Sequence, residues 1–202
     1  MSKQGVERFF DDYVFGFIFS DIEREIALAK SDIEIPGEAQ KTYKGGANFL
    51  CALGLLCYTE FMGGIHMGSF KKGTDKSRFD VFFNLMGADY QAFNQQGDVY
   101  KVFRCGMVHE YLVKKNCVIF MLSGDVRVGV PIGGPLSLVP TLRVSSSMQV
   151  GPVQYGIGFL SDKQYQYFFV VEQYFKDFAN ACRTVYNQLM NSPNPSIPSP
   201  RN

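Results

Sequence analysis

Residues 47–65 carry apolar side chains around almost the whole circumference of a helix, and no other feature constrains the fold of this chain as strongly. A helix that is apolar on all sides lies either at the centre of a protein core or inside a membrane. Its most apolar part, Asn48 to Tyr58, is shorter than the roughly 20 residues that span a bilayer, and Glu60 follows it. We therefore expect the central helix of a helical bundle and no membrane association.

A long amphipathic helix is expected at residues 5–33, because apolar side chains recur there every three to five positions. They are Phe9, Tyr13, Phe17, Ile22, Ile26 and Ala29. The sequence Ile35-Pro36-Gly37 ends this pattern, and a polar link at 39–45 follows.

Further patterns of the same kind predict helices at 76–88 and 98–113, separated by a polar break from Gln91 to Gly97. A last helix is expected to start with a cap at Ser161-Asp162 and to run to about Met190. These helices would surround the apolar one.

A β-rich segment interrupts the helices at about 117–160. Cys117 to Leu122 and Val126 to Val130 flank a turn sequence and predict a hairpin, and Thr141 to Ser145 and Val153 to Phe159 are also strand-like. The predicted fold class is therefore mainly α: a helical bundle with a β-rich insertion before the last long helix. Residues 1–190 are expected to form a single domain. Residues 191–202 hold four prolines and are expected to be a disordered tail.

The cysteines and the charge exclude several classes of protein. Five scattered cysteines without a C-x2-C pair argue against a disulfide framework and a structural zinc site. They favour free thiols in a reducing compartment, and with no signal-peptide pattern we expect a cytoplasmic protein. With a net charge of +1, the molecule as a whole is not a polycation of the kind that binds nucleic acid through its overall charge. Residues 66–116, however, carry eight basic and five acidic side chains. That basic part favours an anionic ligand, and a solvated surface explains it as well.

Arg104 lies five residues before His109, one of only two histidines, on a predicted helix in this basic part. An imidazole moves protons near neutral pH, and a guanidinium matches phosphate geometry, so the pair could serve chemistry at a phosphodiester. The alternative is an arginine on a solvated surface and a histidine in a core. On an α-helix the two would lie about 140° apart around the axis and about 7.5 Å apart along it. Gly106 between them would allow a ligand or a second helix to approach closely.

The segment from Arg104 to His109 resembles the R-x4-6-H motif of the HEPN superfamily, and the order of helices is similar too. The resemblance covers mainly the helical part. It implies an α-helical bundle, often a dimer, that acts as a metal-independent endoribonuclease in toxin–antitoxin or other defence systems. Arg104 and His109 would then be the catalytic pair. The family often has a polar residue after the arginine, whereas this chain has Cys105.

Other residues are candidates for supporting roles. Glu60, in the apolar helix, would be either a paired structural carboxylate or a partner of Arg104, and Glu110 and Tyr111 would either orient His109 or lie on the helix surface. The candidates for contact with an RNA backbone are Lys71, Lys72 and Lys101. No cofactor or metal is expected, because no cluster of ligands is apparent.

Two functions follow as expectations. The first is an RNA-directed, HEPN-like endoribonuclease that leaves 2′,3′-cyclic phosphate ends, with RNA as substrate and an antitoxin or other protein as partner. The second is a non-catalytic HEPN-like interaction or nucleotide-binding domain. We also expect a homodimer, because cleavage needs both an acid and a base and each chain supplies one suitable histidine.

Overall fold

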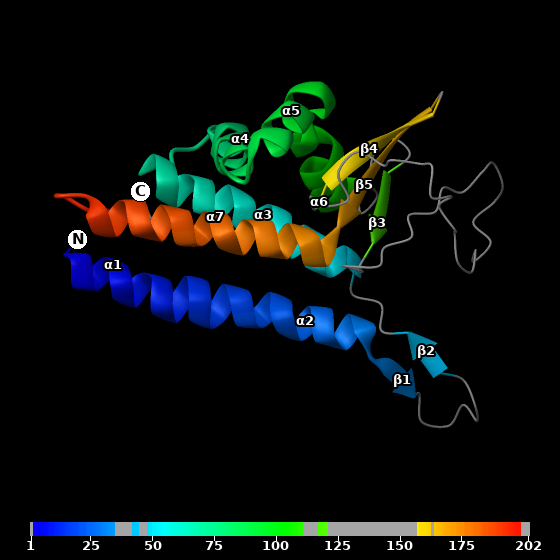
Figure 1. Ribbon diagram of the computed structural model, residues 1–202, viewed down its shortest axis with the longest axis horizontal. Coiled ribbons are helices and arrows are strands. Elements are labelled where there is room, and N and C mark those ends of the chain that lie inside the picture. Colours follow the sequence, from blue (N-terminus) through cyan, green and yellow to red (C-terminus); the bar gives the residue numbers. More distant parts are fainter. Residues whose placement is uncertain are drawn as a thin grey trace.

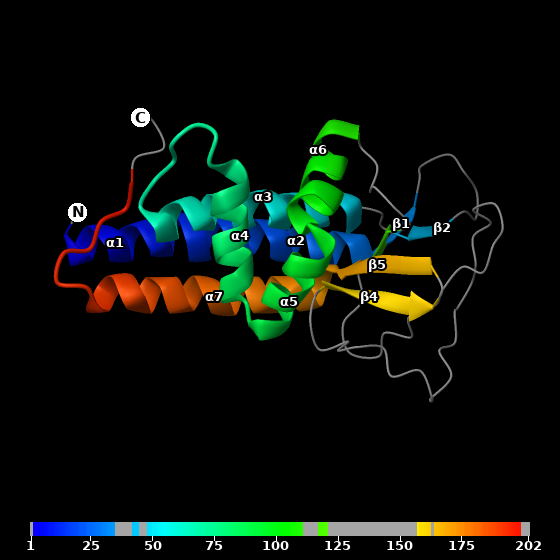
Figure 2. The same ribbon diagram turned by 90° about the horizontal axis from the view of Figure 1, so that it is seen from above.

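The computed structural model describes residues 2–34, 42–44, 48–110, 117–120, 157–162 and 164–198. These residues are mainly helical, as the sequence predicts. Figure 1 shows the long helices side by side, with the two ends of the chain at one end of the molecule and the strands at the other. Figure 2 shows the shorter helices α4, α5 and α6 lying across the long ones on one side.

The first long helix consists of α1 (Lys3–Phe9), the π-helical segment η1 (Phe10–Phe19) and α2 (Ser20–Lys30). It confirms most of the helix predicted at 5–33. The helix ends three residues early, and β1 (Asp32–Glu34) pairs in antiparallel fashion with β2 (Thr42–Lys44), within the predicted polar link.

The buried side of this helix differs from the predicted one in its first half. Its buried side chains recur every fourth residue: Val6, Phe10, Val14, Ile18, Ile22 and Ile26. A π-helical turn holds more residues than an α-helical turn, so η1 keeps this spacing on one face. Tyr13 and Phe17, which the sequence placed in the core, are instead 59% and 60% exposed.

Helix α3 (Asn48–Met67) is the central helix, as predicted, and contacts α2, α4 and α7. Its segment Phe49–Met67 has the length and composition of a membrane span, with a mean hydropathy of 1.3, but 56% of that window is buried within the protein. The buried position and the contacts on several sides are consistent with the core helix of a soluble protein.

Helix α4 (Asp75–Leu85) packs closely on α3 and buries Phe79, Phe82 and Phe83. The predicted polar break at 91–97 is wrong, because these residues belong to helix α5 (Ala88–Gly97). Tyr90 anchors α5 to the core: it is fully buried, with its ring 5.1 Å from that of Phe83 and its hydroxyl donating to Asp177 at 2.5 Å. The segments η2 (Tyr100–Cys105) and α6 (Gly106–Glu110) follow as one continuous helix and confirm the described part of the helix predicted at 98–113.

Three strands form a small sheet beside the bundle: β3 (Cys117–Phe120), β4 (Ile157–Asp162) and β5 (Gln164–Val170). Strand β5 is central, parallel to β3 and antiparallel to β4. Of the predicted β-rich insertion, the described residues are 117–120 and 157–160. The second half of the predicted hairpin and the strand-like piece at 141–145 lie outside the described residues, so the insertion stays a prediction.

The start of the last helix was predicted wrongly. Residues 161–162 and 164–170 lie in strands, and α7 spans Val171–Asn191. The aromatic run that ends β5 favours a strand, and Phe169 is fully buried between the rings of Phe103 and Tyr174. Beyond α7, in the predicted tail, Pro195 is buried and Ile197 packs against the core.

Candidate functional site

Arg104 lies in η2, the π-helical segment that precedes α6, and its side chain is 18% exposed. Its Nη2 atom is 2.8 Å from Oε2 of Glu60 on α3. The ring of Tyr100, one turn earlier, lies 5.6 Å from the guanidinium carbon. The sequence left two roles open for Glu60, a paired structural carboxylate or a partner of Arg104. The structure shows both, because Glu60 contacts Arg104 in a buried ion pair.

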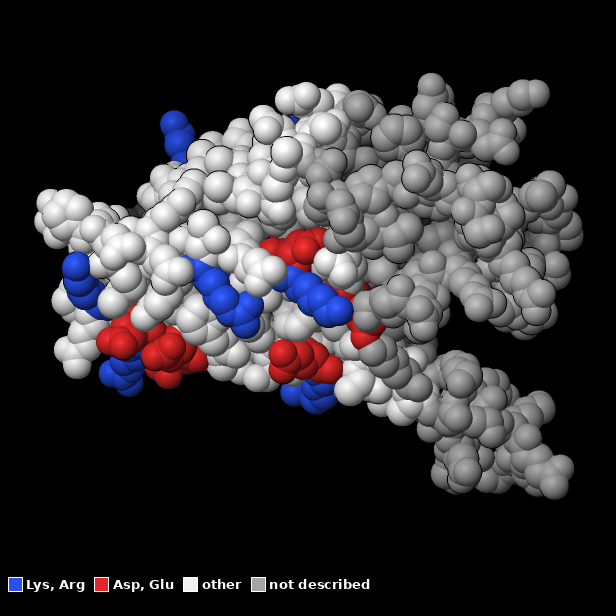
Figure 3. Space-filling model, in the orientation of Figure 1, with Lys and Arg blue, Asp and Glu red and all other residues white. Residues whose placement is uncertain are grey.

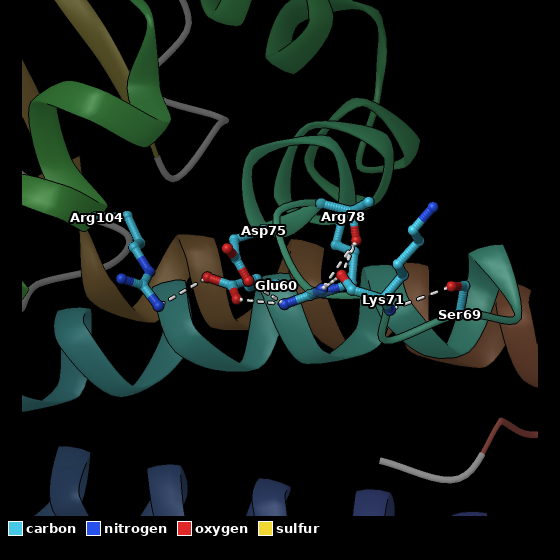
Figure 4. A network of polar contacts seen from close by, with 7 residues as sticks. Glu60, Ser69, Lys71, Asp75, Arg78 and Arg104 are labelled. Carbon is cyan, nitrogen blue, oxygen red and sulfur yellow. Dashed lines mark hydrogen bonds and ion pairs between the residues drawn. The ribbon is translucent and has the colours of Figure 1, made fainter. Parts of the chain in front are cut away.

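Glu60 is shared between two arginines, as Figure 4 shows. Its second oxygen, Oε1, accepts a hydrogen bond from Nη2 of Arg78 on α4 at 2.9 Å. Glu60 is only 9% exposed, and a carboxylate at such depth is stable only with charged or hydrogen-bonding partners. The two guanidinium groups supply those partners from two different elements of the fold.

Arg78 is almost saturated with acceptors. Besides Glu60, its amino groups donate to the carbonyl oxygen of Lys71 at 3.1 Å, to the hydroxyl of Thr74 at 3.0 Å and to the carboxylate of Asp75 at 2.5 Å. Its side chain is 9% exposed, and its Nε has no partner among the described residues. Arg78 thus fastens the loop between α3 and α4 to Glu60.

Arg104 differs from Arg78 in how few of its donors are engaged. Within the part of the chain that the structure describes, it makes no hydrogen bond that meets the usual geometry, and its Nε is buried without a partner. A guanidinium carries five N–H donors in a fixed fork. Arg104 therefore keeps donors available for an anionic ligand, whereas the amino groups of Arg78 are all hydrogen-bonded to the protein.

His109 is exposed on α6, five residues after Arg104. Among the described residues it forms no hydrogen bond or ion pair, so the structure brings Glu60 and Arg104 together but does not join His109 to them by a direct contact. Gly106, between them, is buried. The other histidine, His66, is half-buried near the end of α3, and burial lowers its pKa.

The remaining predicted site residues are less well defined. Glu110 is the last residue of α6, its side chain is not described, and Tyr111 lies outside the described residues. Lys71 and Lys72 are exposed on the loop between α3 and α4, and Lys101 is exposed on η2. In Figure 4 the Lys71 side chain points away from Arg104, on the far side of Arg78. The Lys71 side chain therefore does not enter the ion-pair cluster.

Two groups near Arg104, the Cys57 thiol and the Tyr100 hydroxyl, remain protonated at neutral pH. Burial raises the pKa of the Cys57 thiol, an effect that Arg104 opposes and Glu60 reinforces. Burial also raises the pKa of Tyr100 to about 12, again against the influence of Arg104. Cys51, Cys57, Cys105 and Cys182 are free thiols, as expected. Neither Cys57 nor Tyr100 is thus poised as a nucleophile.

No group of three or more His, Cys, Asp or Glu side chains that could hold a metal ion occurs among the described residues. On the face shown in Figure 3, acidic and basic side chains are interspersed over the described surface, and neither sign dominates. An anionic ligand would therefore have to be bound by local contacts, not by a broad basic surface.

Two residues of this cluster were missed by the sequence reasoning: Arg78, which was counted only in the basic segment, and Tyr100. A signal for Arg78 was present. It stands four residues before Phe82, so both side chains lie on the same face of α4, and that face is buried. An arginine on a buried helix face needs an acidic partner, and Glu60 is the charged residue of the neighbouring apolar helix.

Comparison with known proteins gave no match: no protein-family model fits the chain, and no curated protein and no solved structure is significantly similar to it.

Proposed function

We propose that this chain is an HEPN-like, metal-independent endoribonuclease of a toxin or defence system. The observation that carries the proposal is the state of Arg104. It is anchored by the buried Glu60, it has N–H donors without an acceptor among the described residues, and it belongs to the same helix as the exposed His109. This arrangement resembles the R-x4-6-H motif in residue type and spacing.

The chemistry assigns one task to each residue. RNA cleavage by its own 2′-hydroxyl requires a base that takes the hydroxyl proton while the 2′-oxygen attacks phosphorus. It also requires an acid that protonates the departing 5′-oxygen. His109 would serve as base or acid, and Arg104 would hold the phosphate with two parallel N–H donors and stabilise the charge that develops on it. The products are a 2′,3′-cyclic phosphate and a free 5′-hydroxyl.

The need for both an acid and a base supports a homodimer, since each chain offers one histidine of this kind. We place the two-fold axis near α6, so that two motif helices face each other. Val108, beside His109, is 41% exposed and would lie in such an interface. Lys71, Lys72 and Lys101 would contact the RNA backbone. The protein would act in the cytoplasm, and an antitoxin or other protein would restrain it.

A second function, a non-catalytic HEPN-like interaction or nucleotide-binding domain, is favoured by one specific observation. His109 has no partner among the described residues that fixes the orientation of its ring, and catalytic histidines usually have one. Cys105, which follows Arg104, also lacks the polarity common at this position of the family.

RNA cleavage in the presence of EDTA tests the two proposals against each other. The ribonuclease should cleave RNA without divalent metal, leave 2′,3′-cyclic phosphate ends, and leave intact an otherwise identical oligonucleotide with 2′-deoxyribose at each position. If the wild-type protein cleaves no RNA in a broad panel, the ribonuclease proposal is wrong. Binding of RNA or nucleotides that Arg104→Ala abolishes would then support the second function.

A further inference from the structure

We propose that Glu60 is a positioning residue that fixes the orientation of the Arg104 guanidinium, so that its unspent donors are offered to one phosphate group. The inference rests on the proposed function for the identity of the reaction. The positioning itself rests on the contacts among Glu60, Arg78 and Arg104.

The first step is that Glu60 cannot move freely. One carboxylate oxygen contacts Arg78 at 2.9 Å and the other contacts Arg104 at 2.8 Å, so each oxygen has its own guanidinium. Rotation of the carboxylate would break both contacts; Arg78 would keep its pair with Asp75, but Arg104 would lose the carboxylate that pairs with it. Such a loss is unfavourable where water is scarce.

The second step is that Arg78 holds Glu60 from a rigid part of the fold. Arg78 is tied to Lys71, Thr74 and Asp75 by its other hydrogen bonds. The backbone of α4 at Arg78 also lies against Gly63 of α3, one turn after Glu60, because a Cβ atom there would be 1.7 Å from the Arg78 carbonyl oxygen. The distance between the two helices is therefore set by backbone contact.

The third step concerns what remains of Arg104. Glu60 takes one corner of its guanidinium, at Nη2, and the Tyr100 ring lies beside it. The Nε atom is buried without a partner among the described residues, so the amino-group donors that Glu60 does not hold are those left for a ligand. A guanidinium that is held at one corner presents its other donors in a defined direction, which is the condition for bidentate contact with a phosphate.

The fourth step is an electrostatic consequence that separates positioning from plain stabilisation. Glu60 offsets part of the positive charge of two guanidinium groups. Glu60→Gln would raise the local positive charge, so an anion would bind at least as tightly as before. The guanidinium would, however, lose its anchor, and misplacement of a catalytic group by about 1 Å can lower a rate about 100-fold. Turnover should therefore fall while the affinity for the anion does not.

The test compares the full-length wild type with Glu60→Gln, Glu60→Asp and the control Asp12→Asn. Asp12 also pairs with an arginine, Arg8, but on the exposed side of η1. Two measurements are made on each protein: kcat and KM for RNA cleavage, and a titration with inorganic phosphate followed through the ¹⁵N signal of the Arg104 Nε–H group. That signal is assigned by its disappearance in Arg104→Lys.

For Glu60→Gln we expect a fall in kcat of about tenfold or more, a KM and a phosphate dissociation constant no higher than those of the wild type, and a broadened Arg104 signal. Asp12→Asn should match the wild type in all of these. If Glu60→Gln does not fold, Glu60→Asp decides. Its side chain keeps the charge but is one methylene too short to bridge both arginines, so kcat should fall while phosphate affinity is unchanged.

A wild-type kcat in the decisive Glu60 variant would overturn the inference, and so would a rise in KM without loss of kcat. If the wild type itself cleaves no RNA, the proposed function fails. The width of the Arg104 signal alone then tests whether Glu60 positions Arg104. A signal as sharp in the Glu60 variant as in the wild type would contradict positioning. A broadened one would support it independently of catalysis.

Discussion

Gly63 and Arg78 meet so closely that a Cβ atom on Gly63 would lie 1.7 Å from the carbonyl oxygen of Arg78. No side chain fits at this contact between α3 and α4, and Glu60 and Arg78 form their ion pair one turn away. The same contact therefore serves the packing of the core and the geometry of the candidate site.

Gly63→Ala should destabilise the protein by about 3 kcal/mol or more, because the backbone of α4 has to move away. Gly54→Ala is the matched control in the same helix, since its Cβ would meet its nearest neighbour, Ile22, at an ordinary 3.4 Å. That change should be neutral or slightly stabilising, because alanine favours helices by up to about 1 kcal/mol over glycine. Urea unfolding measures both. Equal stability of the two variants would show that α3 and α4 do not approach as described.

The protein should lose stability as the pH rises above about 9, because the folded state holds protons that the unfolded state releases. Burial raises the pKa of Cys51 from 9.0 to about 11 and that of Tyr100 from 10.0 to about 12. The unfolded state therefore binds fewer protons between pH 9 and pH 12, and the free energy of unfolding falls with pH there. Urea unfolding at several pH values checks this. Cys51→Ala should make the decrease between pH 9 and pH 11 shallower; an unchanged decrease would contradict the role of Cys51.

The sequence predicted the elements that carry long apolar patterns and missed those that depend on single contacts. Helix α3 was predictable because nearly all its residues are apolar. Helix α5 was missed because its sequence is rich in polar residues, and the contact of the buried Tyr90 with the core could not be read from it. Strand β5 was assigned to the last helix because Phe168 precedes Val171 by three residues and so extends the helical spacing of α7. Pairing with β3, which lies far away in the sequence, and with the preceding strand β4 decides that it is a strand.

The candidate site was predictable only in part, for the same reason. The spacing of Arg104 and His109 is local and visible in the sequence. The triad of Glu60, Arg78 and Arg104 joins three separate elements, and the packing of both α4 and η2 on α3 brings it together.

Alanine at Lys71, Lys72 or Lys101 should weaken RNA binding and reduce its salt dependence. Each phosphate contact on a single strand contributes about 0.7 to the slope of log K against log salt concentration. Each of the three substitutions should lower the slope by about that amount if its lysine touches the backbone. Arg24→Gln, at an exposed ion pair on α2, is the control and should leave the slope unchanged. Filter binding between 50 and 200 mM salt measures it. Slopes equal to that of the wild type in all three variants would exclude these lysines from the RNA surface.

The protein should be a dimer at micromolar concentration. An interface of this kind should bury more than about 1,000 Å² in total. Val108→Asp, next to His109 on α6, should shift the equilibrium toward the monomer and lower cleavage with it. Tyr13→Asp, at an even more exposed aromatic position on η1, should leave the dimer intact if the two-fold axis lies near α6. Light scattering decides. A monomeric wild type would remove the two-histidine mechanism, and dissociation by Tyr13→Asp alone would move the interface to the first helix.

The most direct test of the central claim is the cleavage rate of His109→Ala relative to the wild type, measured in EDTA together with the melting temperature. His109 is exposed and forms no hydrogen bond or ion pair among the described residues, so its loss should hardly change stability. We predict that cleavage falls at least about 100-fold while the melting temperature stays within about 2 °C. Cleavage by His109→Ala at the wild-type rate would contradict the account.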